Sequence, residues 1–250
     1  MKSISIFFSL FFTLTFLIVQ CEKEPDPNDP VDIPDQNFLD ALIEEGVDTN
    51  RNGLISYAEA KLVTTIYLDP DSASSSKGSI RSLEGIEAFV NLDTLHFCFN
   101  QVSQLDVSNN SELRVLICWN SDENDQLESL NVSNNKKLEH ISIPGNKLTE
   151  LNVSNCPSLN KLLLWYNQIT DLDISRNTNL LWLGLDGNLL SRLDVSNNIK
   201  LGTTINPALG LSEMPTLTEV CVWTTPFPPS GMEVDTAGSP NVYFTTDCSE

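Results

Sequence analysis

A leucine-patterned unit repeats along the middle of the chain at a nearly constant interval. Each unit opens with L-x-x-[LI]-x-[LIFC] and continues with [VIL]-x-x-L-[DN]-[VI]-S, as in "LTELNVS" from Leu148. One interval is longer because it contains the insertion "SDEND" at residues 121–125. A unit this short cannot bury its own apolar side, so the units must stack, share one core and contribute one parallel strand each. The intervals are 21, 25, 21, 21 and 21 residues, with starts at Leu92, Leu113, Leu138, Leu159, Leu180 and Leu201.

Weaker units flank the clear ones, as the ends of a stacked array require. On the N-terminal side, Val63, Ile66 and Leu68 imitate the start of a repeat before an interrupting loop. On the C-terminal side, "LTEVCVW" restores the strand spacing, and "NVYFTTDC" has the composition of a closing strand. The pattern predicts a repeat solenoid with one parallel strand per unit, with repeats over residues 63–216 and a β-strand cap over residues 217–250.

The repeat resembles that of the leucine-rich repeat family, in a short bacterial form similar to internalin-type proteins. The resemblance covers roughly residues 63–223 and implies an α/β repeat solenoid with a parallel concave β-sheet, to which every unit contributes one strand. It also implies a buried asparagine at the bend after each strand, whose side-chain amide satisfies exposed backbone groups. In the unit from Leu113 the insertion obscures this position, and we expect its bend to bulge outward. The matching residues elsewhere are Asn100, Asn146, Asn167 and Asn188.

The N-terminus has the features of an export signal, because Lys2 precedes an apolar run from Ile4 to Val19 and Cys21 follows. Residues 1–21 resemble a bacterial lipoprotein signal, which implies lipidation at Cys21 and anchoring to the outer membrane. The residue before such a cysteine is usually small, whereas here it is Gln20, so ordinary signal cleavage is the alternative. Residues 22–36 are acidic and proline-rich, which predicts an extended, solvated spacer. An acidic stretch with a lysine just after the cysteine resembles a surface-export signal, which implies exposure at the cell surface.

The charge balance narrows the choice of partners. The chain carries 14 Lys and Arg against 34 Asp and Glu, a formal charge of −20. Removal of residues 1–21 takes away only Lys2 and leaves −21. So acidic a surface repels phosphate backbones and anionic lipid, which excludes nucleic acid as a partner and leaves the lipid anchor as the contact with membrane.

The cysteines suit an exported protein that lacks a dense disulfide framework. Cys221 and Cys248 fall on the two predicted cap strands, where a disulfide would close the open end of the array. Cys98 and Cys118 lie in adjacent repeats at positions of opposite facing, so we expect free thiols. Cys156 stands where the other units have an asparagine, and is expected to be a buried spacer. Those asparagines are Asn110, Asn135, Asn177 and Asn198.

The stretch "DTNRNGLISYAE", residues 48–59, has the spacing of an EF-hand calcium loop. With Gly53 at the turn, its oxygen donors match the template, and few carboxylates beside Arg51 predict weak affinity. The alternative is structural, because Ser56 and Glu59 also form a capping box for a following helix. We expect a structural Ca²⁺ clip in an EF-hand-like N-terminal cap, residues 37–62, rather than a sensor, since the chain has three methionines. The predicted ligands are Asp48, Asn50, Asn52, Leu54 (through its carbonyl), Ser56 and Glu59.

Sequence motifs of catalysis are not found. His96 and His140 occupy different strand positions two repeats apart, and neither has an evident nucleophile with an acidic partner. No GxSxG, HExxH, Walker loop or Gly-rich dinucleotide turn occurs. We therefore expect a protein that is not an enzyme.

The concave sheet is the remaining candidate surface, because alternate strand positions of successive repeats stand side by side there. Its outward positions form an apolar and aromatic strip, a kind of patch that tends to mark binding sites. The leading interpretation is a cell-surface protein-binding or adhesion module. The alternatives are glycan capture, with tryptophans stacking on sugar rings, and a spacer or scaffold with no high-affinity ligand. The structural alternative for the strip is that some of its aromatics pack on one another or under the "SDEND" loop. The predicted ligand-binding residues are Ile117, Trp119, His140, Lys161, Leu163, Trp165, Tyr166, Trp182 and Asp186.

Overall fold

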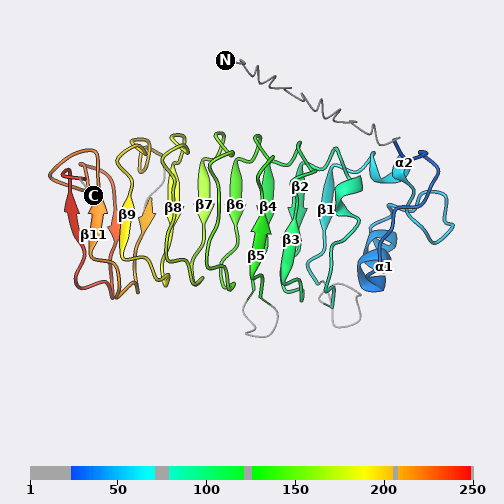
Figure 1. Ribbon diagram of the computed structural model, residues 1–250, viewed down its shortest axis with the longest axis horizontal. Helices are drawn as coiled ribbons and strands as arrows, with labels where there is room; N and C mark the ends of the chain where they lie inside the picture. The colour runs from blue at the N-terminus through cyan, green and yellow to red at the C-terminus, as the bar shows by residue number, and fades with distance from the viewer. Residues whose placement is uncertain (1–23, 71–78, 121–125, 205–207, 249–250) are drawn as a thin grey trace, which may run out of the picture.

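The structure is a computed structural model that describes residues 24–70, 79–120, 126–204 and 208–248. It is an elongated solenoid with helices at the N-terminal end and short strands along the rest (Figure 1). The predicted signal at residues 1–21, with Cys21, and the insertion at 121–125 lie outside the described residues. No helix in the described ranges is long and apolar enough to cross a membrane.

One parallel sheet of eight strands runs the length of the solenoid, with its strands in chain order. Each strand has only two or three residues, and its central or first residue points into the core, as Leu95, Leu116 and Leu162 do. The predicted α/β solenoid with a parallel sheet is confirmed. The strands are β1 (Thr65–Tyr67), β2 (Thr94–His96), β4 (Val115–Ile117), β6 (His140–Ser142), β7 (Lys161–Leu163), β8 (Trp182–Gly184), β10 (Leu209–Gly210) and β12 (Val234–Asp235).

The opposite side of the solenoid carries two smaller parallel sheets. One pairs β3 (Gln104–Asp106) with β5 (Ser129–Asn131), and the other contains β9 (Arg192–Asp194), β11 (Glu219–Cys221) and β13 (Tyr243–Thr245). Pattern analysis expected β11 and β13. It did not predict that β10 and β12 continue the long sheet past the last regular repeat, because the stretches around them lack the leucine pattern.

Buried asparagines at the bends tie successive repeats together. The Asn167 side chain accepts from the Leu148 N–H at 3.1 Å and donates to the carbonyls of Ile143 and Leu164, both at 3.0 Å. In the repeat with the insertion, Asn120 is buried and donates to Asn146 Oδ1 at 3.0 Å, so the residue before the insertion stays within the fold.

A second row of buried asparagines lies at the other turn of each repeat. Asn177 Nδ2 donates to the carbonyls of Val153 and Cys156 of the preceding repeat, at 3.0 and 2.9 Å. Cys156 occupies the same place in its own repeat, is fully buried, and directs its sulfur to the Val132 carbonyl at 3.6 Å. It is therefore a buried thiol in the row of asparagines, and Cys98 and Cys118 are buried free thiols as well.

The N-terminal cap consists of α1 (Gln36–Glu44) and α2 (Tyr57–Ala60). The Asp35 carboxylate accepts from Asn37 and Phe38 at the start of α1 through one oxygen. Its other oxygen accepts from the N–H groups of Arg81 and Ser82 in the first repeat, at 2.7 and 3.0 Å. One side chain thus caps the helix and fastens it to the solenoid, while the apolar side of α1 is buried.

The segment before α1 is more ordered than the predicted solvated spacer over residues 22–36. Pro30 pairs with Ser56 in an antiparallel bridge, and the Val31 N–H donates to the Ile55 carbonyl at 2.8 Å. Val31 is 8% exposed, and Ile33 packs against the core. The prediction was wrong for this part of the segment. It was based on the acidic, proline-rich composition, whereas Val31 and Ile33 are apolar and pack against the core.

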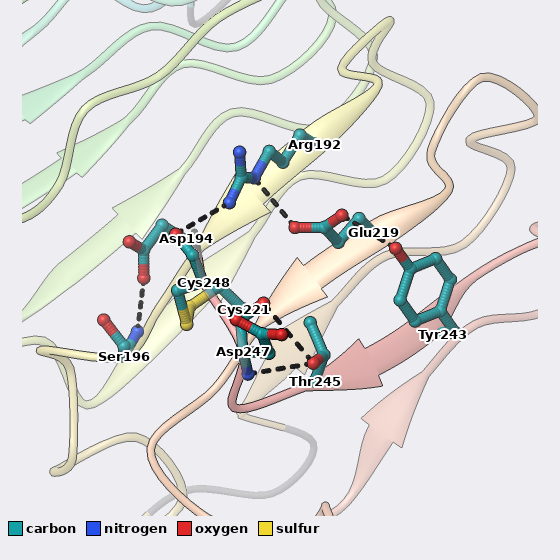
Figure 2. Close-up of a disulfide and its surroundings, with 9 residues drawn as sticks. All are labelled: Arg192, Asp194, Ser196, Glu219, Cys221, Tyr243, Thr245, Asp247 and Cys248. Atoms are coloured by element: carbon teal, nitrogen blue, oxygen red, sulfur yellow. Dashed lines mark hydrogen bonds and ion pairs between the residues drawn. A yellow bond between two sulfur atoms is a disulfide. The ribbon is translucent and has the colours of Figure 1, made fainter. Parts of the chain in front are cut away.

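The C-terminal cap is held by one disulfide and a set of polar contacts (Figure 2). Cys221 on β11 is bonded to Cys248, with their Cα atoms 5.5 Å apart. Glu219 forms an ion pair with Arg192 Nε of β9 at 2.9 Å and accepts a hydrogen bond from the Tyr243 hydroxyl of β13 at 2.7 Å. The cap is therefore cross-linked both covalently and across three adjacent strands.

Candidate binding face and calcium loop

The concave side chains lean from one repeat onto the next. Trp119 follows β4, and its indole Nε1 donates to Ser142 Oγ on β6 at 2.9 Å. Trp165 follows β7 and lies over Gly184 of β8, where an added Cβ would be 1.9 Å from the indole nitrogen. Each large side chain thus rests on a small residue of the next strand, and only glycine fits beneath Trp165.

This arrangement changes which predicted residues are accessible. Leu163 lies between Ser142 and Gly184 in the same row of the sheet, so it sits between the two indoles. It is only 2% exposed and cannot be a ligand contact, so its assignment to the binding strip was wrong. The remaining predicted residues stay at the surface: Trp119 and Tyr166 are exposed, and Ile117, His140, Lys161, Trp165, Trp182 and Asp186 are half-buried.

At the centre of the face, the side chains of Lys161, Trp165 and Trp182 contact one another. The Lys161 ammonium lies 4.4 Å from the centroid of the Trp182 ring, in a cation–π contact. The rings of Trp165 and Trp182 are 6.0 Å apart and tilted by 57°. Burial, followed by the charges of Lys161 and His96, lowers the pKa of His140 to about 4, so this imidazole is neutral at pH 7. The two tryptophans therefore pack on neighbours, as the scaffold interpretation expected.

Three exposed aromatic side chains lie instead at the edge where the concave strands end. Phe99, Trp119 and Tyr166 are 48%, 48% and 56% exposed. Phe99 and Tyr166 each precede a bend asparagine and have left-handed backbones, with φ of 56° and 53°. Other repeats place Gly145 and Gly187 at this position, also with positive φ. Sequence analysis missed Phe99, although an aromatic residue where related units have glycine was a visible signal.

The loop at residues 48–59 is closed by Glu59. One carboxylate oxygen accepts from the Thr49 N–H, the Thr49 hydroxyl and the Asn50 N–H, at 2.9, 2.8 and 3.2 Å. The other accepts from the N–H and hydroxyl of Ser56, which completes the capping box of α2. Burial alone would raise the pKa of Glu59, but these hydrogen bonds outweigh it and lower the pKa to about 2.

The donor set of the loop fits calcium in kind and in spacing. Asp48 is buried, and its carboxylate accepts hydrogen bonds from the N–H groups of Asn52 and Gly53, so the loop turns around this carboxylate. The described part of the chain contains no group of three His, Cys, Asp or Glu side chains that could hold a metal ion, so a site here depends on amide, carbonyl and hydroxyl oxygens. An ion would also have to displace donors from Glu59, whose oxygens already accept five hydrogen bonds.

Comparison with known proteins identifies the architecture. No protein-family model and no curated protein matches the sequence. Among solved structures, internalin C2 from Listeria monocytogenes matches with a TM-score of 0.53 and 17% identity, over 90% of this chain and 89% of that one. InlP from the same organism matches with a TM-score of 0.51 and 17% identity, over 89% of this chain and 72% of that one.

The fold is a leucine-rich repeat solenoid. Its long sheet is the concave sheet of that architecture, and its two smaller sheets lie on the convex side. At this level of identity the likeness concerns the fold, and the function has to be argued from the face itself.

Proposed function

We propose that this leucine-rich repeat protein is a binding module that recognises a protein or peptide along the edge where the concave strands end. The observation that carries the proposal is the exposure of Phe99, Trp119 and Tyr166 along that edge. Aromatic side chains that are anchored at one side and exposed at the other are typical anchors of protein interfaces.

Backbone strain supports the same conclusion. A left-handed conformation costs a residue other than glycine roughly 1–2 kcal/mol. Phe99 and Tyr166 bear this cost at a position where other repeats use glycine. Neither is buried, so core packing does not account for the choice of residue. Strained residues that persist at a surface are a signal of function.

Glycan capture is the second candidate, and the geometry favours it less. Stacking on a sugar requires an open aromatic face. Trp165 and Trp182 are half-buried and tilted against each other, and the Lys161 ammonium covers the ring of Trp182. Catalysis has less support still, since His96 and His140 lie on β2 and β6, which are separated by β4.

Selection of a phage-displayed random peptide library on residues 24–250, which contain the helices and strands that the structure describes, tests the proposal. We expect enriched peptides whose affinity falls about tenfold or more for Trp119→Ala, because the variant removes a large exposed anchor. Fluorescence polarisation of labelled peptides measures the loss. Ile199→Ala is the control, since Ile199 is 61% exposed and belongs to a turn outside the concave strands.

A library that yields no peptide dependent on Trp119 would contradict the proposal. A saturable change in tryptophan fluorescence on adding a polysaccharide, lost in Trp165→Ala, would establish the glycan alternative.

We propose further that the protein is exported, anchored through lipidated Cys21 to the outer membrane and exposed at the cell surface. The basis is the leader sequence, with Lys2, an apolar run and Cys21. Incorporation of labelled palmitate tests this proposal. Label should enter the wild-type protein and be absent from Cys21→Ser, and equal labelling of both would contradict the anchor.

The third proposal is that the loop at residues 48–59 binds Ca²⁺ weakly as a structural clip, with the ligands predicted from the sequence. Millimolar calcium is expected to raise the thermal midpoint of the wild-type protein over that measured in EDTA, because the ion binds only the folded loop. Differential scanning calorimetry checks the shift.

Glu59→Gln separates the clip from the capping box. The variant should have a lower midpoint than the wild type even in EDTA, because an amide accepts fewer of the five hydrogen bonds at Glu59. It should also lose the response to calcium. A wild-type midpoint that is the same in calcium and EDTA would leave the loop with its capping role alone.

A further inference from the structure

One corner of the binding edge combines an aromatic ring with two carboxylates from successive repeats. Tyr166 follows β7, Asp186 follows β8, and Glu213 follows β10. The Tyr166 N–H donates to the Asp186 carbonyl at 2.7 Å, so the backbones of the first two are adjoining. The Tyr166 ring lies over Gly187, where an added Cβ would be 2.5 Å from a ring carbon. The phenol is thereby directed along the edge toward the next repeat.

Glu213 reaches the same corner from the next repeat. The Gly187 N–H donates to the Ser212 carbonyl at 2.9 Å, so Glu213 stands beside the glycine that the Tyr166 ring covers. The pKa of Tyr166 is raised, chiefly by the charge of Glu213, then by burial, by the charge of Asp186 and by a hydrogen bond from the phenol to Glu213. Both carboxylates therefore act on the same phenol. Tyr166 and Glu213 are exposed and Asp186 is half-buried, so the corner is open to solvent.

The two carboxylates are held in place without a counter-charge. Asp186 Oδ1 accepts from the N–H and hydroxyl of Ser212, at 3.0 and 2.5 Å, which fixes its position. Glu213 has φ of 56°, at the position where neighbouring repeats have Gly187 and Gly238. Among the described residues, neither carboxylate forms an ion pair. The negative charges of Asp186 and Glu213 are therefore available to a cationic ligand. The one on Glu213 is carried by a residue with a strained, left-handed backbone.

Lys161, the basic side chain near this corner, already contacts an aromatic ring of the same face. Lys161 directs its ammonium to the ring of Trp182 at 4.4 Å, which shows that this sheet can hold a cation against an aromatic ring. His140 is neutral at pH 7 because its pKa is lowered to about 4. Phosphate, sulfate and acidic polymers would be repelled by the corner, whereas a cation would be attracted both by the carboxylates and by the ring face.

We propose that the partner inserts an arginine or lysine side chain at the corner formed by Tyr166, Asp186 and Glu213. The proposal deepens the proposed function and rests on it. The cationic head lies against the phenol ring and pairs with the carboxylates, while the apolar part of the partner contacts Phe99 and Trp119 along the same edge. A guanidinium suits the corner better than an ammonium, because it can stack on a ring and bond a carboxylate at once.

The peptides selected on the wild-type protein test this inference through their basic residues. Arginine and lysine should be enriched over the starting library. Replacing the dominant basic residue of a selected peptide with alanine should weaken binding to the wild type about tenfold. The same replacement should have little effect on binding to the double variant Asp186→Asn, Glu213→Gln.

The substitutions preserve shape, because an amide oxygen at position 186 can still accept from Ser212, and circular dichroism checks that the double variant remains folded. The double variant Asp171→Asn, Asp173→Asn is the matched control, because it removes the same charge from two exposed side chains that lie outside the concave strands. It should keep the preference for basic peptides.

The outcomes distinguish failure of the proposed cation site from failure of the proposed peptide-binding function. Peptides that depend on Trp119 but show no basic preference, or that lose equal affinity on the wild type and the double variant, would overturn this inference and leave the proposed function standing. If no peptide depends on Trp119, the proposed function fails, and the inference fails with it.

Discussion

Replacing Asn167 by alanine is expected to lower the free energy of unfolding by about 3 kcal/mol. In the described part of the chain, the Leu148 N–H has Asn167 Oδ1 as its hydrogen-bond acceptor, at 3.1 Å, and this group is buried. The carbonyls of Ile143 and Leu164 would each also lose a donor. An unsatisfied buried N–H bears its full desolvation cost, which makes this effect larger than the loss of an ordinary hydrogen bond.

Asn152→Ala is the control for this prediction. Asn152 is exposed, and within the described ranges its side-chain oxygen accepts from the N–H and hydroxyl of Ser154, two residues away. Water can replace both bonds, so the expected loss is below about 1 kcal/mol. Urea unfolding followed by circular dichroism measures both variants. Equal losses for Asn152 and Asn167 would show that the buried asparagine does not stabilise the solenoid in the way described.

Removing the disulfide by Cys248→Ser is expected to destabilise the protein by roughly 3–4 kcal/mol through the entropy of the released loop. The bond joins residues 27 positions apart and closes the open end of the solenoid. Loss should be concentrated in β11, β13 and the neighbouring β9, because each repeat depends mainly on the one beside it. Amide hydrogen exchange should show faster exchange there than in β4 to β7.

Dithiothreitol provides the matched condition for the disulfide. It should lower the unfolding midpoint of the wild type toward that of Cys248→Ser and leave the variant unchanged. The buried thiols Cys98, Cys118 and Cys156 are present in both proteins, so their contribution cancels. A wild-type midpoint that reduction does not move would show that the polar contacts of Arg192, Glu219 and Tyr243 suffice to hold the cap.

The sequence predictions failed where a residue's environment depends on residues of other repeats. Leu163 has the alternation of an outward-facing strand residue and was predicted to be accessible. It is covered because the Trp119 indole reaches Ser142 on β6 and the Trp165 indole lies over Gly184 on β8, on either side of Leu163. Val31 gave no periodic signal within an acidic segment, yet it pairs with Ile55 of the loop. β10 and β12 join the sheet without the leucine pattern, because β10 pairs with the regular strand β8 and β12 in turn pairs with β10.

The repeat interval, the apolar pattern and the buried asparagines determined by themselves that this chain forms a leucine-rich repeat solenoid, because each is a local requirement that every unit meets in the same way. Only the tertiary structure decided which concave side chains remain open. Trp119 and Tyr166 stay exposed while Leu163 is buried, because the large side chains lean onto small residues of the next repeat. The accessibility of a side chain on a stacked sheet depends on the side chains of adjacent repeats, so it cannot be read from the sequence of one repeat.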